Sequence, residues 1–255
     1  MKTVDSQQPS VISQSKEQGA KNKEQKITAV DFNLYLITDR KLFTDNSSLF
    51  TAVDEALKGG LRAVQLREKD LGTRDLLDMA YKMRELTRIY EAKLFINDRV
   101  DIALAVEGDG VQLGRQSIPA HAVRKTFRDK LKIGVSTHSL DEALGAEKGG
   151  ADFITLGPVY HTPSKMKYGE PIGVENLRNV QAKISIPVFA IGGIKLDEVS
   201  EVKETGADGV ALISAILTAE HMKETTEEFL GYLYDENRMC EKRNYYRRGK
   251  GCCSL

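Results

Sequence analysis

The sequence repeats one short phrase, in which a helix-like segment ends at glycine and an apolar, strand-like run follows. Four copies read LKGGLRAVQLR, VEGDGVQLG, EKGGADFITLG and ETGADGVALIS. Glycine after a helix supplies the left-handed cap conformation, and the short link then returns the chain to the sheet. Strands that alternate with helices through right-handed crossovers lie parallel to one another. The repeat therefore predicts an α/β protein with a parallel sheet.

Eight apolar runs have the length and composition of strands. They are Leu34–Ile37, Ala63–Leu66, Leu94–Ile96, Gly110–Leu113, Leu131–Val135, Phe153–Leu156, Pro187–Ile191 and Gly209–Ile213. Segments that can hold helices separate them, such as Leu49–Leu57, Arg74–Tyr90, Leu140–Glu147 and Leu196–Glu204. Eight strand–helix units fit one closed (β/α)8 barrel, or TIM barrel. An open doubly wound sheet is the alternative, but no GxGxxG motif follows the first strand. We predict a single TIM barrel over residues 29–237.

The two ends of the chain differ in composition from this barrel. Residues 1–28 are rich in Gln, Ser and Lys and contain no aromatic residue, which predicts a disordered polar tail. Residues 238–255, RMCEKRNYYRRGKGCCSL, form a basic, cysteine-containing tail that we expect to be frayed and solvated. The final CCSL has the cysteine spacing of a prenylation box, but Cys253 and Ser254 are not aliphatic, so we expect no lipid attachment.

Charge and composition exclude several classes of protein. Lys+Arg and Asp+Glu balance at 37 each, which argues against a general nucleic-acid binder. No apolar run approaches the ~20 residues of a membrane helix, and the first residues lack the apolar segment of a secretory signal. We therefore expect a cytoplasmic protein without a membrane partner. The three cysteines, Cys240, Cys252 and Cys253, leave the predicted barrel without a disulfide or a thiolate metal site.

Polar residues follow every predicted strand, at the end where TIM barrels place their active sites. The strand ends read Thr38-Asp39-Arg40, Gln65-Leu66-Arg67-Glu68-Lys69, Asn97-Asp98, Gly114-Arg115-Gln116-Ser117, Ser136-Thr137-His138, the loop GPVYHTPSKMKYGEPIG, Gly192-Gly193 and Ser214. Alternation along the second strand sends Gln65, Arg67 and Lys69 to one side. Arg115 and Lys165 add two more cations to the same rim. This cluster indicates an anionic ligand.

Two further features of the rim suggest how anions are held. The loop after the sixth strand carries Thr162, Ser164 and Lys165, whose hydroxyls and ammonium group match diphosphate oxygens. Taken alone, this segment is also compatible with an ordinary polar surface loop that binds no anion. Gly192-Gly193 and Ser214, at a predicted helix start, suggest a phosphate held by backbone N–H groups.

A metal is expected at the anion site near the second, third and sixth strands. Asp98, beside Asn97, offers hard oxygen ligands for Mg²⁺, which usually binds one or two carboxylates together with substrate phosphates. The rim would then accommodate a monophosphate near the seventh and eighth strands. A diphosphate with Mg²⁺ would lie near the second, third and sixth.

These motifs resemble those of a known superfamily, that of thiamine phosphate synthase and its paralogue, thiazole tautomerase. The resemblance runs from Tyr35 to Leu217 and rests on QLREK, IND, GVS-H, GPVYHTPSK, IGGI and GADGVALISAI. It implies a transferase that joins hydroxymethylpyrimidine diphosphate to a thiazole phosphate and releases pyrophosphate. The implied mechanism is dissociative: pyrophosphate leaves an electron-rich pyrimidine methylene, and the thiazole nitrogen captures the cation.

The resemblance also implies a role for individual residues. The pyrimidine-diphosphate contacts map onto Gln65, Arg67, Lys69, Asn97, Ser136 and Lys165, and the thiazole-phosphate contacts onto Thr162, Ser164, Gly193, Ile213 and Ser214. The magnesium carboxylate maps onto Asp98. Arg67, Lys69, Ser136, His138 and Lys165 are the residues we expect to act in catalysis. The expected partners are two phosphorylated small molecules, with no nucleic acid and no membrane, and a homo-oligomer is left open.

One position departs from the synthase pattern. Ser117 stands where a second acidic magnesium ligand is usual, so either Arg115 neutralises diphosphate directly, water completes the metal shell, or the metal-dependent reaction is weakened. The tautomerase is therefore an alternative, with His138 as the implied proton shuttle, although synthases can also carry a histidine there. A non-catalytic thiamine-precursor binder is a third. Intact QLREK, Asp98 and the Thr-x-Ser-Lys loop favour the synthase.

Overall fold

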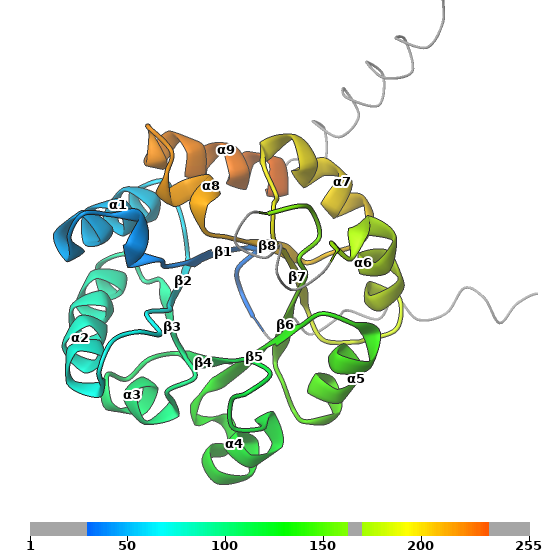
Figure 1. Cartoon of the computed structure of the whole chain (residues 1–255), viewed down its shortest axis with the longest axis horizontal. Helices are drawn as coiled ribbons and strands as arrows, with labels where there is room; N and C mark the ends of the chain where they lie inside the picture. The colour runs from blue at the N-terminus through cyan, green and yellow to red at the C-terminus, as the bar shows by residue number, and fades with distance from the viewer. Residues whose placement is uncertain (1–29, 163–169, 235–255) are drawn as a thin grey trace, which may run out of the picture.

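A computed structural model describes residues 30–162 and 170–234, which form a closed barrel of eight parallel strands within a ring of helices (Figure 1). Each strand pairs with the next along the chain, and β8 closes the barrel on β1. The prediction of a single TIM barrel is confirmed. The disorder expected of residues 1–28 and 238–255, and the site roles expected of Ser164 and Lys165, fall outside the described residues.

Strands and helices alternate along the chain as far as β8, which is followed by two helices. The strands are β1 (Leu34–Ile37), β2 (Ala63–Leu66), β3 (Lys93–Asn97), β4 (Gly110–Leu113), β5 (Lys132–Thr137), β6 (Phe153–Leu156), β7 (Val188–Ile191) and β8 (Gly209–Leu212). The helices are α1 (Asn46–Lys58), α2 (Thr73–Ile89), α3 (Val100–Ala105), α4 (Ala120–Phe127), α5 (Leu140–Lys148), α6 (Gly173–Gln181), α7 (Val199–Glu204), α8 (Ser214–Leu217) and α9 (Met222–Tyr234). Short 3-10 turns are η1 (Arg40–Leu42), η2 (Arg128–Lys130) and η4 (Leu196–Glu198).

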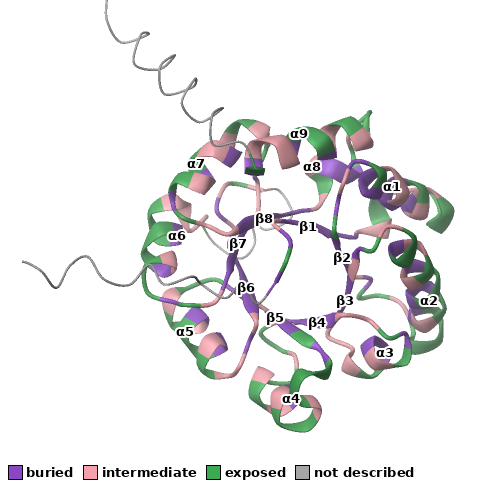
Figure 2. Ribbon diagram, turned by 180° about the vertical axis from the view of Figure 1, so that it is seen from behind, coloured by how far each residue is buried: buried purple, intermediate pink, exposed green. Residues whose placement is uncertain are grey.

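Burial follows the two-layer design of such a barrel. The strands are buried along most of their length, whereas the surrounding helices bury their inner faces and expose their outer ones (Figure 2). Leu and Val side chains fill the space between sheet and helices, as the apolar stripe of an amphipathic helix requires. Among the described residues, no helix combines the length and the apolar character needed to cross a membrane.

Aromatic rings fill the barrel interior on the N-terminal side of the C-terminal rim. Phe32 precedes β1, and Tyr35, Phe95, Phe153 and Phe189 come from β1, β3, β6 and β7; the ring centroids of neighbours lie 5.2–6.2 Å apart. Tilted and edge-on contacts of this kind add to the stabilisation from burial. The rings close the barrel below its C-terminal rim, so a ligand can be held only above them.

Glycines on adjacent strands make room for three of these rings. In the strand register Phe95 lies opposite Gly110, Phe153 opposite Gly134, and Phe189 opposite Gly209. A Cβ atom on any of the three glycines would lie 2.4–2.6 Å from the facing ring. Each large side chain thus depends on a residue without a side chain in the neighbouring strand, as close packing demands.

The acidic residue of the repeated phrase has a structural role at the opposite end of the barrel. Before β4, β6 and β8, an aspartate Oδ2 accepts a hydrogen bond from a backbone N–H near the start of the preceding strand: Asp109 from Leu94 (2.9 Å), Asp152 from Ile133 (2.7 Å) and Asp208 from Val188 (2.9 Å). A helix side chain binds the same oxygen: Arg84 (2.7 Å), Arg124 (2.5 Å) and Gln181 (3.2 Å) respectively. The repeat therefore ties the strands together in pairs.

Candidate active site

The predicted polar residues gather at the C-terminal rim because all eight parallel strands end there. Across the ends of β2 and β3, the amide Nε2 of Gln65 donates to Oδ1 of Asn97 at 3.0 Å. Asn97 in turn donates through Nδ2 to Oδ2 of Asp98 at 2.7 Å. Three of the predicted site residues therefore form one hydrogen-bonded chain. Gln65 is almost fully buried, and its Oε1 has no hydrogen-bond partner among the described residues.

Asp98 has an uncommon backbone conformation that fixes its direction. Its φ of 61° lies in the left-handed region, where aspartate is tolerated better than most residues, and its N–H donates to the carbonyl of Gln112 at 2.9 Å. The turn ends β3 and places the carboxylate beside the loop that follows β4. Ser117 lies in that loop, and its hydroxyl donates to Oδ1 of Asp98.

Ser117 is itself held in place by the backbone. Its Oγ accepts a hydrogen bond from the N–H of Gly114 at 2.6 Å. The residue that departs from the synthase pattern therefore faces the expected metal carboxylate. Within the described ranges, no group of three or more His, Cys, Asp or Glu side chains could enclose a metal. Asp98 alone offers a hard carboxylate here, because Asn97 turns its amide nitrogen and not its oxygen toward Asp98. A single carboxylate suits Mg²⁺ only where phosphate and water complete the shell.

A second polar network lies beneath the rim and centres on Gln112, a β4 residue that the sequence interpretation missed. Gln112 is 1% exposed, and its Nε2 donates to Ser136 at 3.1 Å and to Thr155 at 3.4 Å. Tyr35 donates to its Oε1 at 3.5 Å, and burial raises the pKa of this phenol. Ser136, a predicted site residue, is thus supported from below by buried groups. A polar residue inside the apolar run GVQL was the available signal.

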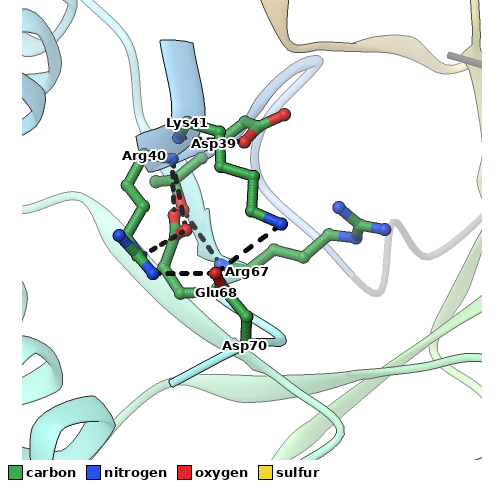
Figure 3. A network of polar contacts seen from close by, with 7 residues as sticks. Asp39, Arg40, Lys41, Arg67, Glu68 and Asp70 are labelled. Atoms are coloured by element: carbon green, nitrogen blue, oxygen red, sulfur yellow. Dashed lines mark hydrogen bonds and ion pairs between the residues drawn. The ribbon is translucent and has the colours of Figure 1, made fainter. Parts of the chain in front are cut away.

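Three of the predicted rim cations, Arg67, Lys69 and Arg115, lie in the described part of the chain. Arg67 is partly buried, whereas Lys69 and Arg115 are exposed. In the described part of the chain, no hydrogen bond or ion pair reaches the charged group of any of the three. Figure 3 shows the Arg67 side chain running away from the neighbouring carboxylates of Glu68 and Asp70. An anionic ligand would therefore displace no described side chain from these three charged groups.

Glu68 is the second residue that the sequence interpretation missed. It lies between Arg67 and Lys69, is 4% exposed, and accepts from the Thr38 hydroxyl at 2.6 Å and from the N–H of Arg40 at 3.2 Å (Figure 3). Burial raises the pKa of its carboxyl, although the Thr38 and Arg40 hydrogen bonds act in the opposite direction. The alternation that sends Arg67 and Lys69 to one side leaves Glu68 on the other, and this was the signal available.

The second predicted anion site lies where β6, β7 and β8 end. Gly192 and Gly193 have φ values of 97° and 73°, and a Cβ on Gly193 would lie 2.5 Å from the carbonyl oxygen of His161. Only glycine allows the two loops to approach this closely. Thr162 directly follows His161 in the chain. Thr162 and Gly193 therefore belong to the two neighbouring loops that follow the adjacent strands β6 and β7.

The end of β8 completes this side of the rim. Ile191 of β7 lies opposite Ala211 of β8, so Gly193 and Ile213 leave neighbouring strands at the same level. Ile213 precedes α8, whose first residue is Ser214, and the Ser214 side chain is exposed. The predicted residues of both anion sites that lie in the described chain therefore share one rim.

His138 is held by the helix that follows it, α5. It follows β5, and its Nδ1 lies 3.0 Å from Oε2 of Glu142, which also accepts the backbone N–H of His138 at 2.8 Å. The ring is exposed. This arrangement orients the imidazole at the rim, and the catalytic role expected of His138 stays a prediction.

The family of the chain follows from its sequence as well as from this geometry. The family model described as thiamine monophosphate synthase matches residues 34–216. A putative thiamine-phosphate synthase of Geobacter sulfurreducens is 51% identical over 204 residues, which are 80% of this chain and 95% of that protein. The thiamine-phosphate synthase of Pyrococcus furiosus is 47% identical over 195 residues, 76% of this chain and 91% of that one.

Solved structures agree with this assignment. Thiamine phosphate pyrophosphorylase from Pyrococcus furiosus superposes with a TM-score of 0.72 at 44% identity, over 79% of this chain and 95% of that one. A 3-hexulose-6-phosphate synthase has a TM-score of 0.63 at 15% identity, over 79% of this chain and 100% of that one, and shares the barrel fold alone. On the match to residues 34–216 and these identities, the chain belongs to the thiamine monophosphate synthase family.

Proposed function

We propose that the protein is a thiamine-phosphate synthase, which couples hydroxymethylpyrimidine diphosphate to thiazole phosphate and releases pyrophosphate. The observation that carries this proposal is the hydrogen-bonded chain from Gln65 through Asn97 and Asp98 to Ser117. It lies on the same rim as the Arg67 guanidinium, which has no partner among the described residues. It lies in a chain whose relatives at 43–51% identity include named thiamine-phosphate synthases.

Arg67 and Lys69 would stabilise the negative charge that develops on the departing pyrophosphate. Cations placed in advance at the position of the developing charge lower the barrier without reorganising at the moment of reaction. Arg67, partly buried and unpaired among the described residues, is better screened from water than the exposed Lys69. Arg67 is therefore expected to contribute the larger share. The same role remains proposed for Lys165.

Asp98 is the proposed magnesium ligand. Mg²⁺ bound there would neutralise phosphate charge and so weaken the bond to the leaving group. Asn97 and Ser117 each donate to one oxygen of Asp98, so the apoprotein already holds this carboxylate in one orientation. With a single carboxylate from the protein, the metal would depend on the diphosphate for most of its other ligands.

The acceptor half of the reaction would take place beside Gly193, Ile213 and Ser214. Backbone N–H groups near the Gly192-Gly193 turn and the start of α8 suit a phosphate. Beneath both halves, Gln112 and Ser136 form a polar floor above the aromatic layer. That layer shuts out water from below, and a dry site protects a reactive pyrimidine cation from hydrolysis.

One assay tests the proposal against its alternatives. Incubation with both phosphorylated substrates and Mg²⁺ should yield thiamine phosphate and pyrophosphate in equal amounts, detectable by chromatography. Isomerisation of a thiazole carboxylate phosphate without coupling would reject the synthase in favour of the tautomerase. Tight binding of both substrates with neither reaction would identify a non-catalytic binder.

A further inference from the structure

Glu68 lies at the centre of a polar cluster that joins the ends of β1 and β2, although it faces away from the proposed substrates. Its carboxylate accepts from the Thr38 hydroxyl and from the N–H of Arg40. The Arg40 guanidinium lies 3.9 Å from Oε2, beyond hydrogen-bond distance, and binds Asp70 at 2.7 Å instead. A buried carboxylate is costly unless several groups satisfy it. This one has a hydroxyl, a backbone N–H and a nearby cation.

Thr38 connects this carboxylate to the backbone of Arg67. The Thr38 hydroxyl, which is fully buried, accepts a hydrogen bond from the N–H of Arg67 at 2.9 Å and donates its own proton to Glu68. The N–H of Thr38 also donates to the carbonyl of Gln65 at 2.9 Å. Two contacts therefore fix the backbone around Arg67. The N–H of Arg67 binds Thr38, and the next residue, Glu68, is anchored through its side chain.

This cluster bears on anion binding because Arg67 has no other support within the described chain. The charged end of Arg67 has no hydrogen bond or ion pair there, so among the described residues its orientation depends on its backbone and packing (Figure 3). An anchored backbone reduces the entropy lost when a long side chain is ordered on a ligand. The contact with Thr38 thus helps to orient Arg67 before a ligand binds.

We propose that Glu68 is a positioning residue that acts through Thr38 to hold Arg67 for the pyrophosphate part of the substrate. The inference rests on the proposed function. A purely structural link between β1 and β2 is the competing explanation. It predicts lower stability without any specific effect on anion binding.

Inorganic pyrophosphate, titrated calorimetrically in the presence of Mg²⁺, separates the two explanations. Glu68→Ala and Thr38→Val should each weaken pyrophosphate binding about tenfold, as expected for residues coupled in one network. In an Arg67→Ala background the same two substitutions should change the affinity by less than about twofold. Thr38→Ser, which keeps the hydroxyl, and Asp70→Asn, a matched carboxylate two residues from Glu68, should bind like the unchanged protein.

Each other outcome overturns the proposal. Unchanged affinity in a folded Glu68→Ala protein with a lower Tm would leave Glu68 as a structural link only. An equal loss with and without Arg67 would show that Glu68 acts by another route. If Glu68→Ala does not fold, equal affinity of Thr38→Val and Thr38→Ser overturns it. No pyrophosphate binding by the unchanged protein also overturns it, whereas the coupling assay described above decides the proposed function separately.

Discussion

The hydroxyl of Ser117 donates a hydrogen bond to the carboxylate of Asp98. The loop after β4 therefore brings position 117 against the proposed metal ligand, at the place where the synthase pattern has a second carboxylate. Serine at position 117 keeps a contact with Asp98 but carries no negative charge. The metal affinity of the free protein is accordingly expected to be low, and to rise when a diphosphate supplies further oxygens.

Substitution at this position tests the metal assignment. Ser117→Asp should tighten Mg²⁺ binding by about tenfold or more, because a second carboxylate beside Asp98 adds negative charge that a cation can neutralise. Ser117→Ala is the control and should leave Mg²⁺ affinity within about twofold, since a hydroxyl contributes little charge. Isothermal titration with Mg²⁺, with and without pyrophosphate, measures both. If Asp98→Asn leaves the Mg²⁺ dependence of turnover unchanged, the metal lies elsewhere.

Arg67 should matter more than Lys69 for turnover. Arg67→Ala is expected to lower kcat by ~10²-fold or more, because it removes charge stabilisation from the leaving pyrophosphate. Arg67→Lys should recover only part of this loss, since an ammonium group cannot make the two parallel hydrogen bonds of a guanidinium. Lys69→Ala, at an exposed position, should cost less. Steady-state rates of pyrophosphate release rank the three variants, and an equal effect of Arg67→Ala and Lys69→Ala would contradict this ranking.

The architecture could be predicted from sequence because its signals are local. Short apolar runs bounded by glycine or charge located β2, β4 and β6 at their observed limits, and all eight strands were found. β5 extends to Thr137, two residues past the predicted end, because the polar Ser136 and Thr137 continue the ladder opposite Thr155 and Leu156. Polar residues at the end of a strand can belong to the sheet when a neighbouring strand supplies partners.

The supports of the site depend on contacts between distant residues, which the sequence pattern does not show. Glu68 acquires its partner from Thr38, 30 positions earlier, and Gln112 finds Ser136 and Thr155 on two other strands. Periodicity shows which face a residue occupies and not what it meets there. Conversely, the predicted strand-end residues within the described chain do lie on one rim, because parallel strands leave no other arrangement.

The raised pKa of Glu68 predicts a pH dependence of stability. Burial is the main cause; Asp39 raises the pKa further, whereas the hydrogen bonds and the Arg40 charge lower it. The folded protein therefore binds this proton more tightly than the unfolded chain does. The stability that Glu68 contributes is fully present below its unfolded pKa and is lost as the pH rises through its folded pKa. Glu68→Gln stays neutral throughout, so it should become more stable relative to the unchanged protein as the pH rises from ~4 to ~7.

Urea unfolding of Glu68→Gln and the unchanged protein across this range provides the measurement. The amide itself can change the free energy of unfolding by a constant amount at every pH. The test is therefore how the difference in the free energy of unfolding between the variant and the unchanged protein varies with pH. Asp70→Asn serves as the control, because the pKa of that exposed carboxyl is lowered rather than raised. Its titration therefore lies below most of this range, and its difference in the free energy of unfolding should be nearly constant above pH ~5. Parallel curves for Glu68→Gln would show that its pKa is not raised.

Three helix side chains bind the aspartates that precede β4, β6 and β8, and Gln181 makes the longest of these three contacts. Its Nε2 donates to Asp208 at 3.2 Å, but its Oε1 is buried without a partner among the described residues. Arg84 and Arg124 bind the corresponding aspartates at 2.7 and 2.5 Å. Gln181→Arg replaces the unpaired acceptor with donors and adds a charge opposite Asp208. We expect it to raise the free energy of unfolding by about 0.5–1 kcal/mol, since this partly exposed ion pair is screened by water.

Two controls separate the ion pair from other effects of this substitution. Gln181→Met removes the buried acceptor without adding a charge, so any gain shared with Gln181→Arg comes from losing the unpaired oxygen. Asp208→Asn in the Gln181→Arg background should abolish the remainder, and high salt should reduce it, because salt screens an exposed ion pair. Thermal unfolding followed by circular dichroism compares the variants. A lower Tm for Gln181→Arg would mean that the end of α6 cannot accommodate the guanidinium, and that the glutamine was retained there for its size.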